Sequence, residues 1–234
     1  MAEIATRIEG IVESPFRYSY QTPRRIQRAL APVLRVVFGV FLNITIEGIE
    51  HIRGLPNGIL AASHTSFLDG PVLLAAVPRK FLPIFFVTRE LSFYKRLRRF
   101  GWGMYARALG GIDVPGNTQN YSRALAEFAY LGNRGASIAI FPEGTRTNGI
   151  GAGKARGGIG YLALATSAPI VPVAITGVKQ TGFFDFFFRR RAVRVIFGKP
   201  IDRATFTRAV ASGENQYKSV AEHVIMPAIR ELAG

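Results

Sequence analysis

The stretch 58–70 reads GILAASHTSFLDG, in which a short apolar run is followed at once by a polar segment. A continuous apolar run of this length, bounded by glycine and a polar loop, is typical of a strand buried on both faces. Such strands belong to sheets covered by helices, and the loops at their carboxyl ends are where sites form. The stretch therefore predicts an α/β fold and places His64 at a functional edge of the sheet.

Further segments have the composition of strands, and helical segments separate several of them. We expect strands at 43–47, 81–87, 137–141, 169–175 and 192–197. We expect helices at 90–100, 121–131, 158–166 and 215–232, the last of them interrupted or kinked near Pro227. Strands that alternate with helices indicate a single α/β domain with a central, mostly parallel or mixed sheet flanked by helices.

The N-terminal part of the chain differs in character from the rest. The apolar run 29–42, ALAPVLRVVFGVFL, contains Pro32 and Arg35 and is shorter than the ~20 residues that span a bilayer. We therefore expect a buried or amphipathic helix instead of a membrane span, and the alternative is an interfacial helix that enters one leaflet. No repeat or low-complexity linker divides the 234 residues. We divide the chain into an N-terminal membrane-interface helical segment, 1–42, and a folded catalytic domain, 43–234.

The chain is strongly basic, with 30 Lys and Arg against 15 Asp and Glu and a net charge of +15. Such a surface attracts nucleic acid, anionic lipid headgroups or phosphorylated substrates. At 24–28 (RRIQR) and 183–191 (FFDFFFRRR) the cations lie beside apolar residues, a pairing that suits a bilayer interface. We therefore expect an anionic membrane surface as partner and no nucleic acid, since no nucleic-acid-binding motif is present. The alternative for 183–191 is a core strand with solvated arginines.

Of the three histidines, His64 has the most informative context, whereas His51 and His223 have that of structural or surface residues. His64 follows a predicted buried strand and precedes Asp69 by five residues. A neutral imidazole can take a proton from an alcohol when a carboxylate fixes its tautomer and balances the charge it gains. Side chains five residues apart on an ideal helix point ~140° apart. Contact between them therefore requires a bend, such as a strand-to-helix turn.

A second polar stretch, FPEGTR at 141–146, begins where another predicted strand ends. Gly144 allows a tight turn or a close approach to a ligand. Arg146 can bind a phosphate with two N–H groups, and Glu143 can accept a hydrogen bond from a polyol or orient Arg146. Lys154-Ala155-Arg156-Gly157-Gly158 adds cations and glycines before a helix, as an anion site requires. The plainer alternatives are a Glu143–Arg146 salt bridge and a solvated loop.

Taken together, these motifs resemble the glycerolipid acyltransferase family, which includes 1-acylglycerol-3-phosphate acyltransferases and related lysophospholipid acyltransferases. The resemblance rests on His64 and Asp69 with four residues between them, on FPEGTR at 141–146, and on the apolar segment 170–173. It extends over about residues 40–200. The resemblance implies that His64 is the general base and Asp69 the acid that orients it.

The resemblance also implies a set of binding residues. Those that match the block holding the glycerol-phosphate end of the acceptor are Glu143, Gly144, Thr145 and Arg146, with Arg156 as a further basic position and Pro172 near the acyl-binding region. One departure concerns the segment 109–116, LGGIDVPG, where the family usually has an Arg that helps to bind phosphate. Asp113 in this segment has the wrong sign for that task, so a different lysolipid or lipid-like alcohol remains a candidate acceptor.

The implied reaction moves a fatty acyl group from acyl-CoA or acyl carrier protein to the hydroxyl of a lysophospholipid such as 1-acylglycerol-3-phosphate, in phospholipid biosynthesis or remodelling. We expect no metal and no cofactor beyond the thioester co-substrate, and a peripheral or monotopic location on the cytoplasmic face of a membrane. A Ser-His-Asp hydrolase is disfavoured because no G-x-S-x-G elbow is present. The remaining alternative is a basic lipid-binding module without catalysis.

Overall fold

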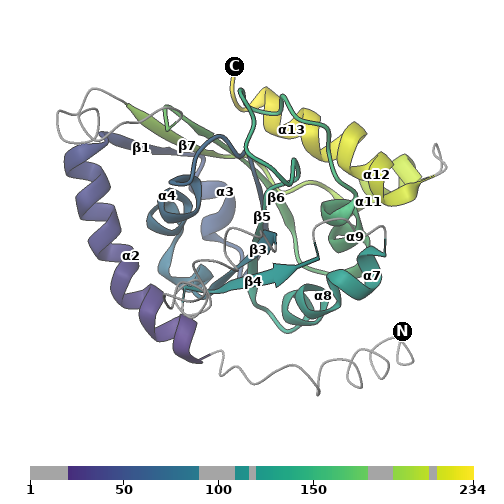
Figure 1. Ribbon diagram of the computed structural model, residues 1–234, viewed down its shortest axis with the longest axis horizontal. Coiled ribbons are helices and arrows are strands. Elements are labelled where there is room, and N and C mark those ends of the chain that lie inside the picture. Colours follow the sequence, from purple (N-terminus) through teal and green to yellow (C-terminus); the bar gives the residue numbers. More distant parts are fainter. Residues whose placement is uncertain (1–20, 90–108, 116–119, 179–191, 211–214) are drawn as a thin grey trace.

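The computed structural model describes residues 21–89, 109–115, 120–178, 192–210 and 215–234, drawn in colour in Figure 1. Its centre is a seven-stranded sheet with the order β1-β7-β6-β2-β5-β3-β4. The strands are β1 (Ile44–Glu47), β2 (Ile59–Ala62), β3 (Ile84–Arg89), β4 (Gly111–Val114), β5 (Ser137–Ile140), β6 (Ile170–Thr176) and β7 (Val193–Phe197). Neighbouring strands are parallel except for β6 and β7, which pair antiparallel. The predicted α/β fold is confirmed.

Helices cover both faces of the sheet (Figure 1). The helices are α2 (Gln21–Phe41), α3 (Glu50–Arg53), α4 (Asp69–Ala76), α7 (Tyr121–Ala124), α8 (Ala126–Asn133), α9 (Gly158–Ala165), α11 (Arg203–Val210), α12 (Gln216–Val220) and α13 (Met226–Glu231), with a π-helix, Ala221–Ile225, between the last two. Because side chains alternate along a strand, Ile59 and Leu60 of β2 belong to opposite core clusters. Helices α2 and α4 cover one cluster, and α8, α9 and α13 cover the other.

Several predicted boundaries differ from those of the structure. Strand β3 begins at Ile84 and not at residue 81, since Pro83 has no N–H to offer to a ladder. The predicted helix 121–131 is two helices, α7 and α8, that meet at Leu125. The predicted helix 90–100 and the basic aromatic run 183–191 lie outside the described residues. Helix α2 falls within the predicted N-terminal segment, whose boundary after residue 42 remains a prediction.

Helix α2 is bound to the sheet through the buried side chain of Gln27. The Gln27 amide nitrogen donates to the carbonyl oxygens of Ile84 (2.7 Å) and Leu109 (2.8 Å), and its oxygen accepts the Ile84 N–H (2.8 Å). Strand β4 pairs with β3 only from Gly111 opposite Phe86 onward. Gln27 therefore takes the place that a strand residue would occupy beside Ile84.

Replacing Gln27 by leucine is expected to lower the free energy of unfolding by about 2–4 kcal/mol, because each buried backbone group left without a partner costs ~1–3 kcal/mol. Urea unfolding followed by circular dichroism would measure this change. Gln216 lies exposed at the start of α12, so Gln216→Leu is the matched control. Equal unfolding midpoints for the two variants would show that Gln27 does not anchor α2.

Candidate active site

The centre of the site is the contact between His64 and Asp69. Strand β2 ends at Ala62, and the chain turns within a few residues into α4, whose first residue is Asp69. The His64 Nδ1 lies 2.9 Å from Asp69 Oδ2. The same carboxylate oxygen accepts the backbone N–H groups of Thr65 (2.7 Å) and Ser66 (2.8 Å). The strand-to-helix turn thus supplies the bend that contact between these two side chains requires.

Asp69 is completely buried, whereas the imidazole of His64 reaches the edge of a cavity. The ring of Phe141 stacks on that imidazole, with ring centroids 4.1 Å apart and an angle of 20° between the planes. Because Nδ1 contacts Asp69, Nε2 is the ring nitrogen left to act as a base. A histidine held on two sides in this way is suited to accept a proton in one fixed orientation.

Glu143 lies behind His64 and is buried. One of its carboxylate oxygens accepts the backbone N–H of His64 (3.2 Å), and the other accepts the Thr147 hydroxyl (3.1 Å) and the Gly153 N–H (3.3 Å). The Thr147 N–H donates to the carbonyl oxygen of His64 (2.9 Å). The main chain of His64 is therefore held at both its N–H and its C=O by the 143–153 segment. No ion pair joins Glu143 to Arg146, although both belong to the described residues.

Two arginines from the loops after β5 reach the cavity. The guanidinium of Arg146 lies over the ring of Phe67, 3.5 Å from its centroid. The side chain of Arg156 packs against Gly144, where a Cβ would lie only 2.6 Å from Arg156 Cδ. Gly144 also has φ +65°, so glycine is favoured there by both backbone conformation and space. Both guanidinium groups are exposed, and no carboxylate of the described ranges forms an ion pair with either.

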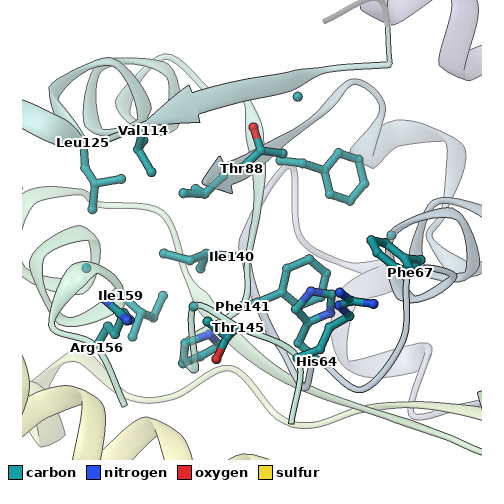
Figure 2. A pocket seen from close by; sticks show the side chains of 18 of the residues that line it. His64, Phe67, Thr88, Val114, Leu125, Ile140, Phe141, Thr145, Arg156 and Ile159 are labelled. Carbon is teal, nitrogen blue, oxygen red and sulfur yellow. The ribbon is translucent and has the colours of Figure 1, made fainter. Parts of the chain in front are cut away.

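The cavity has a volume of about 660 Å³ and lies at the carboxyl ends of β2, β5, β3 and β4. Its polar lining comes from His64, Thr88, Tyr121, Thr145, Arg146 and Arg156, and most other lining residues are apolar. Figure 2 shows Thr145 between Arg156 and His64, with Val114, Leu125, Ile140 and Ile159 on the side of the cavity away from Phe67. Leu30 and Leu34 of α2 also line it. A cavity with this lining suits an amphiphile that carries an anionic group.

Most of the predicted site residues meet in this cavity, but not all of them. His64, Gly144, Thr145, Arg146 and Arg156 line it, and Asp69 and Glu143 support His64 from behind. Pro172 is buried in β6 and is not among the lining residues; its carbonyl oxygen accepts the Gly198 N–H (2.9 Å). The roles of these residues remain predictions, as does the expected absence of a metal or cofactor.

The segment that lacks the expected arginine forms β4 and the turn before it. Asp113 is exposed, and its Oδ1 accepts the hydroxyl of Thr88 (2.7 Å), its direct partner across the two strands. Thr88, Phe67 and Thr147 are site residues that the sequence analysis did not assign. Phe67 lies between His64 and Asp69, and Thr147 directly follows FPEGTR. Their closeness in sequence to these motifs could have indicated that both belong to the site.

A profile of the acyltransferase family matches residues 43–176, which is more than half of the chain. The chain therefore belongs to the acyltransferase family, as its motifs predicted. A chloroplastic 1-acyl-sn-glycerol-3-phosphate acyltransferase of Arabidopsis thaliana is 28% identical over 166 residues, covering 69% of this chain and 44% of that protein. Human 1-acyl-sn-glycerol-3-phosphate acyltransferase beta is 34% identical over 119 residues, covering 49% of this chain and 40% of that protein.

The chain thus spans less than half the length of these curated relatives. Among solved structures, it is similar to the crystal structure of the 1-acyl-sn-glycerophosphate acyltransferase PlsC from Thermotoga maritima. The TM-score is 0.60 at 23% sequence identity, and the match covers 100% of this chain and 88% of that chain. At this level of identity the likeness supports the fold.

Proposed function

We propose that the chain transfers a fatty acyl group from a thioester to the hydroxyl of a lysophospholipid such as 1-acylglycerol-3-phosphate. The observation that carries this proposal is the His64–Asp69 pair at a largely apolar cavity that also contains two exposed guanidinium groups. Membership of the acyltransferase family supports the reaction class. The relatives named for 1-acyl-sn-glycerol-3-phosphate support the acceptor class.

In the proposed reaction, Nε2 of His64 takes the proton of the acceptor hydroxyl while the hydroxyl oxygen attacks the thioester carbonyl. A C–O bond forms, and the carbonyl becomes an oxyanion that needs nearby hydrogen-bond donors. When the intermediate collapses, the C–S bond breaks and the leaving thiolate recovers the proton from His64. Asp69 stabilises the imidazolium between the two proton transfers.

The acyl donor in this proposal is acyl-CoA or acyl carrier protein, both of which are acidic partners for a chain of net charge +15. The proposed setting is phospholipid biosynthesis or remodelling. A purified protein offered palmitoyl-CoA or palmitoyl acyl carrier protein with a panel of lysolipids should form a diacyl product, detected by mass spectrometry. Vesicle binding without any transfer from either donor would instead favour the lipid-binding module.

Arg146 is proposed to bind the acceptor phosphate. Arg146→Ala is expected to raise the acceptor KM about tenfold or more, because a hydrogen bond to a charged group contributes ~1.5–3 kcal/mol. The kcat should change little, since the Arg146 guanidinium lies over Phe67 and is no part of the His64–Asp69 hydrogen bond. Steady-state kinetics with varied acceptor would measure both constants.

Arg134 provides a matched control, because its guanidinium also stacks on an aromatic ring, that of Tyr130, at 4.4 Å from the centroid. Arg134→Ala removes the same charge and the same kind of contact outside the cavity lining. It should leave the acceptor KM unchanged. A fall in kcat at constant KM in Arg146→Ala would contradict a phosphate-binding role.

We also propose that α2 lies at an anionic membrane surface, with the protein peripheral or monotopic on the cytoplasmic face. Val33, Val36 and Val40 are 56%, 65% and 50% exposed and form one stripe along α2, three and four residues apart. Arg24 and Arg25 are exposed near the start of the same helix. In the described part of the chain, no helix combines the length and apolarity that crossing a bilayer requires. The stripe and the cations support an interfacial position.

Val36→Asp is expected to weaken binding to vesicles of phosphatidylcholine and phosphatidylserine at least tenfold, because burial of a valine side chain contributes ~1.5–3 kcal/mol and the new charge adds repulsion. Co-sedimentation would measure the partition coefficient. Thr207→Asp adds the same charge on the exposed side of α11 and is the control. Equal partitioning of both variants would remove α2 from the binding surface.

A further inference from the structure

The loop that follows FPEGTR contacts Glu143, which holds the main chain of His64, on one side and helix α13 on the other. Residue Gly153 donates its N–H to Glu143, and Thr147 donates its hydroxyl to the same carboxylate oxygen. A Cβ at Gly153 would lie 2.8 Å from the Thr147 side chain and 3.2 Å from that of Glu143. The loop therefore packs directly on the carboxylate that holds the His64 main chain, and its position fixes that of Glu143.

The same loop is held from its other side by Arg230 of α13. The Arg230 Nε donates to the carbonyl oxygen of Gly151 at 3.0 Å. Gly151 is buried with φ +63°, and a Cβ at this position would lie 2.6 Å from Arg230 Cγ. The close approach and the hydrogen bond together fix the middle of the loop against α13.

The π-helix before α13 determines which face of α13 meets the loop. A π turn closes i→i+5 hydrogen bonds, one residue more than an α turn, and each helical residue rotates the face by ~100°. After the π-helix Ala221–Ile225, Met226 and Ile229 point into the core, which leaves the next residue, Arg230, at the edge beside Gly151. π turns are frequent at functional sites.

We propose that Arg230 is a positioning residue for the reaction, an inference that rests on the proposed function. It acts through two intermediates: Arg230 holds Gly151, the loop presents the Gly153 N–H to Glu143, and Glu143 accepts the backbone N–H of His64. Arg230 does not line the cavity and so contacts neither acceptor nor donor there. Its effect should therefore appear in turnover and not in acceptor binding.

Arg230→Met is expected to lower kcat about tenfold with the acceptor KM within about twofold, because a remote change that misplaces a reacting group by ~1 Å can cost ~10²-fold in rate and this variant acts through two intermediates. Arg230→Lys should recover most of the activity, since its ammonium can donate to the same carbonyl oxygen. Arg208 is exposed on α11, so Arg208→Met removes an equal charge and is the control. Thermal unfolding of each variant would establish that all are folded at the assay temperature.

A double-mutant cycle with Glu143→Gln separates positioning from general destabilisation. If Arg230 acts through Glu143, the double variant should have the kcat of Glu143→Gln alone, because the two changes break one network. A kcat of Arg230→Met equal to that of wild type, or losses that multiply in the double variant, would overturn the inference. Absence of acyl transfer by the wild type would instead count against the proposed function, so the two failures are distinguishable.

Discussion

His64→Ala is expected to lower the kcat of acyl transfer by about 10²–10⁴-fold, the range typical of losing a general base. The fold should survive, because the backbone N–H and C=O of residue 64 keep their hydrogen bonds to Glu143 and Thr147 whatever the side chain. The ring itself contributes one contact to Asp69 and a stack on Phe141. Acyl transfer to the preferred lysolipid under saturating conditions, with circular dichroism of both proteins, would measure the loss.

His51 provides the control for this prediction. Its Nδ1 lies 2.9 Å from the carbonyl oxygen of Phe197, and it is partly buried as His64 is. Its Nε2 lies 3.9 Å from Glu50 Oε1. His51→Ala therefore removes a comparable imidazole that also lies beside a carboxylate, but away from the cavity lining, and should retain wild-type kcat. Full activity of His64→Ala in the same assay would mean that the proton acceptor is another group. It would leave the acyltransferase family assignment intact.

The strands around the site could be predicted because their signal is local. The apolar runs before His64 and before FPEGTR end where β2 and β5 end, within one or two residues. Adjacent parallel strands place both following loops at the same sheet edge. The order of apolar and polar residues thus placed His64 and the 141–147 segment each at a strand end, whereas the pairing of β2 with β5 is seen only in the structure.

Features that leave no amphipathic pattern in the sequence were not predicted. Helix α4, DGPVLLAA, is apolar on nearly all sides, so it has no amphipathic pattern to indicate a helix. Gln27 reads as one polar residue in a basic run, yet its partners Ile84 and Leu109 lie 57 and 82 residues further along the chain. Such contacts depend on the assembled sheet and have no counterpart in sequence spacing.

The predicted partners of Glu143 illustrate the same limit within a motif. The three-residue spacing of Glu143 and Arg146 suggested a local ion pair or a role in binding the acceptor. Nothing in the sequence indicated that Glu143 accepts the N–H of His64, 79 residues earlier in the chain. A buried carboxylate must have its oxygens satisfied, and the structure satisfies both with donors from residues 64, 147 and 153. Residue type and position in the motif were predictable, whereas the direction of the side chain was not.

Asp69 is placed so that its charge can be removed with little change in geometry. Its Oδ2 accepts the N–H groups of Thr65 and Ser66 in addition to the contact with His64, whereas its buried Oδ1 has no hydrogen-bond partner among the described residues. In Asp69→Asn the amide oxygen should therefore take the place of Oδ2, because an NH₂ there would face two N–H donors. The ring of His64 then keeps its orientation and its neutral hydrogen bond.

We expect Asp69→Asn to lower kcat by about 10²-fold or more at unchanged acceptor KM, which is less than the ~10⁴-fold loss in Ser-His-Asp enzymes, where the same change also gives the wrong histidine tautomer. The physical reason is that a neutral amide no longer stabilises the imidazolium that forms when His64 takes the proton. Asp202 accepts the N–H of Ala204 at the start of α11 and is exposed, so Asp202→Asn is the control. A wild-type kcat for Asp69→Asn would mean that the carboxylate only shapes the turn between β2 and α4, and the charge balance proposed for His64 would have to come from elsewhere in the cavity.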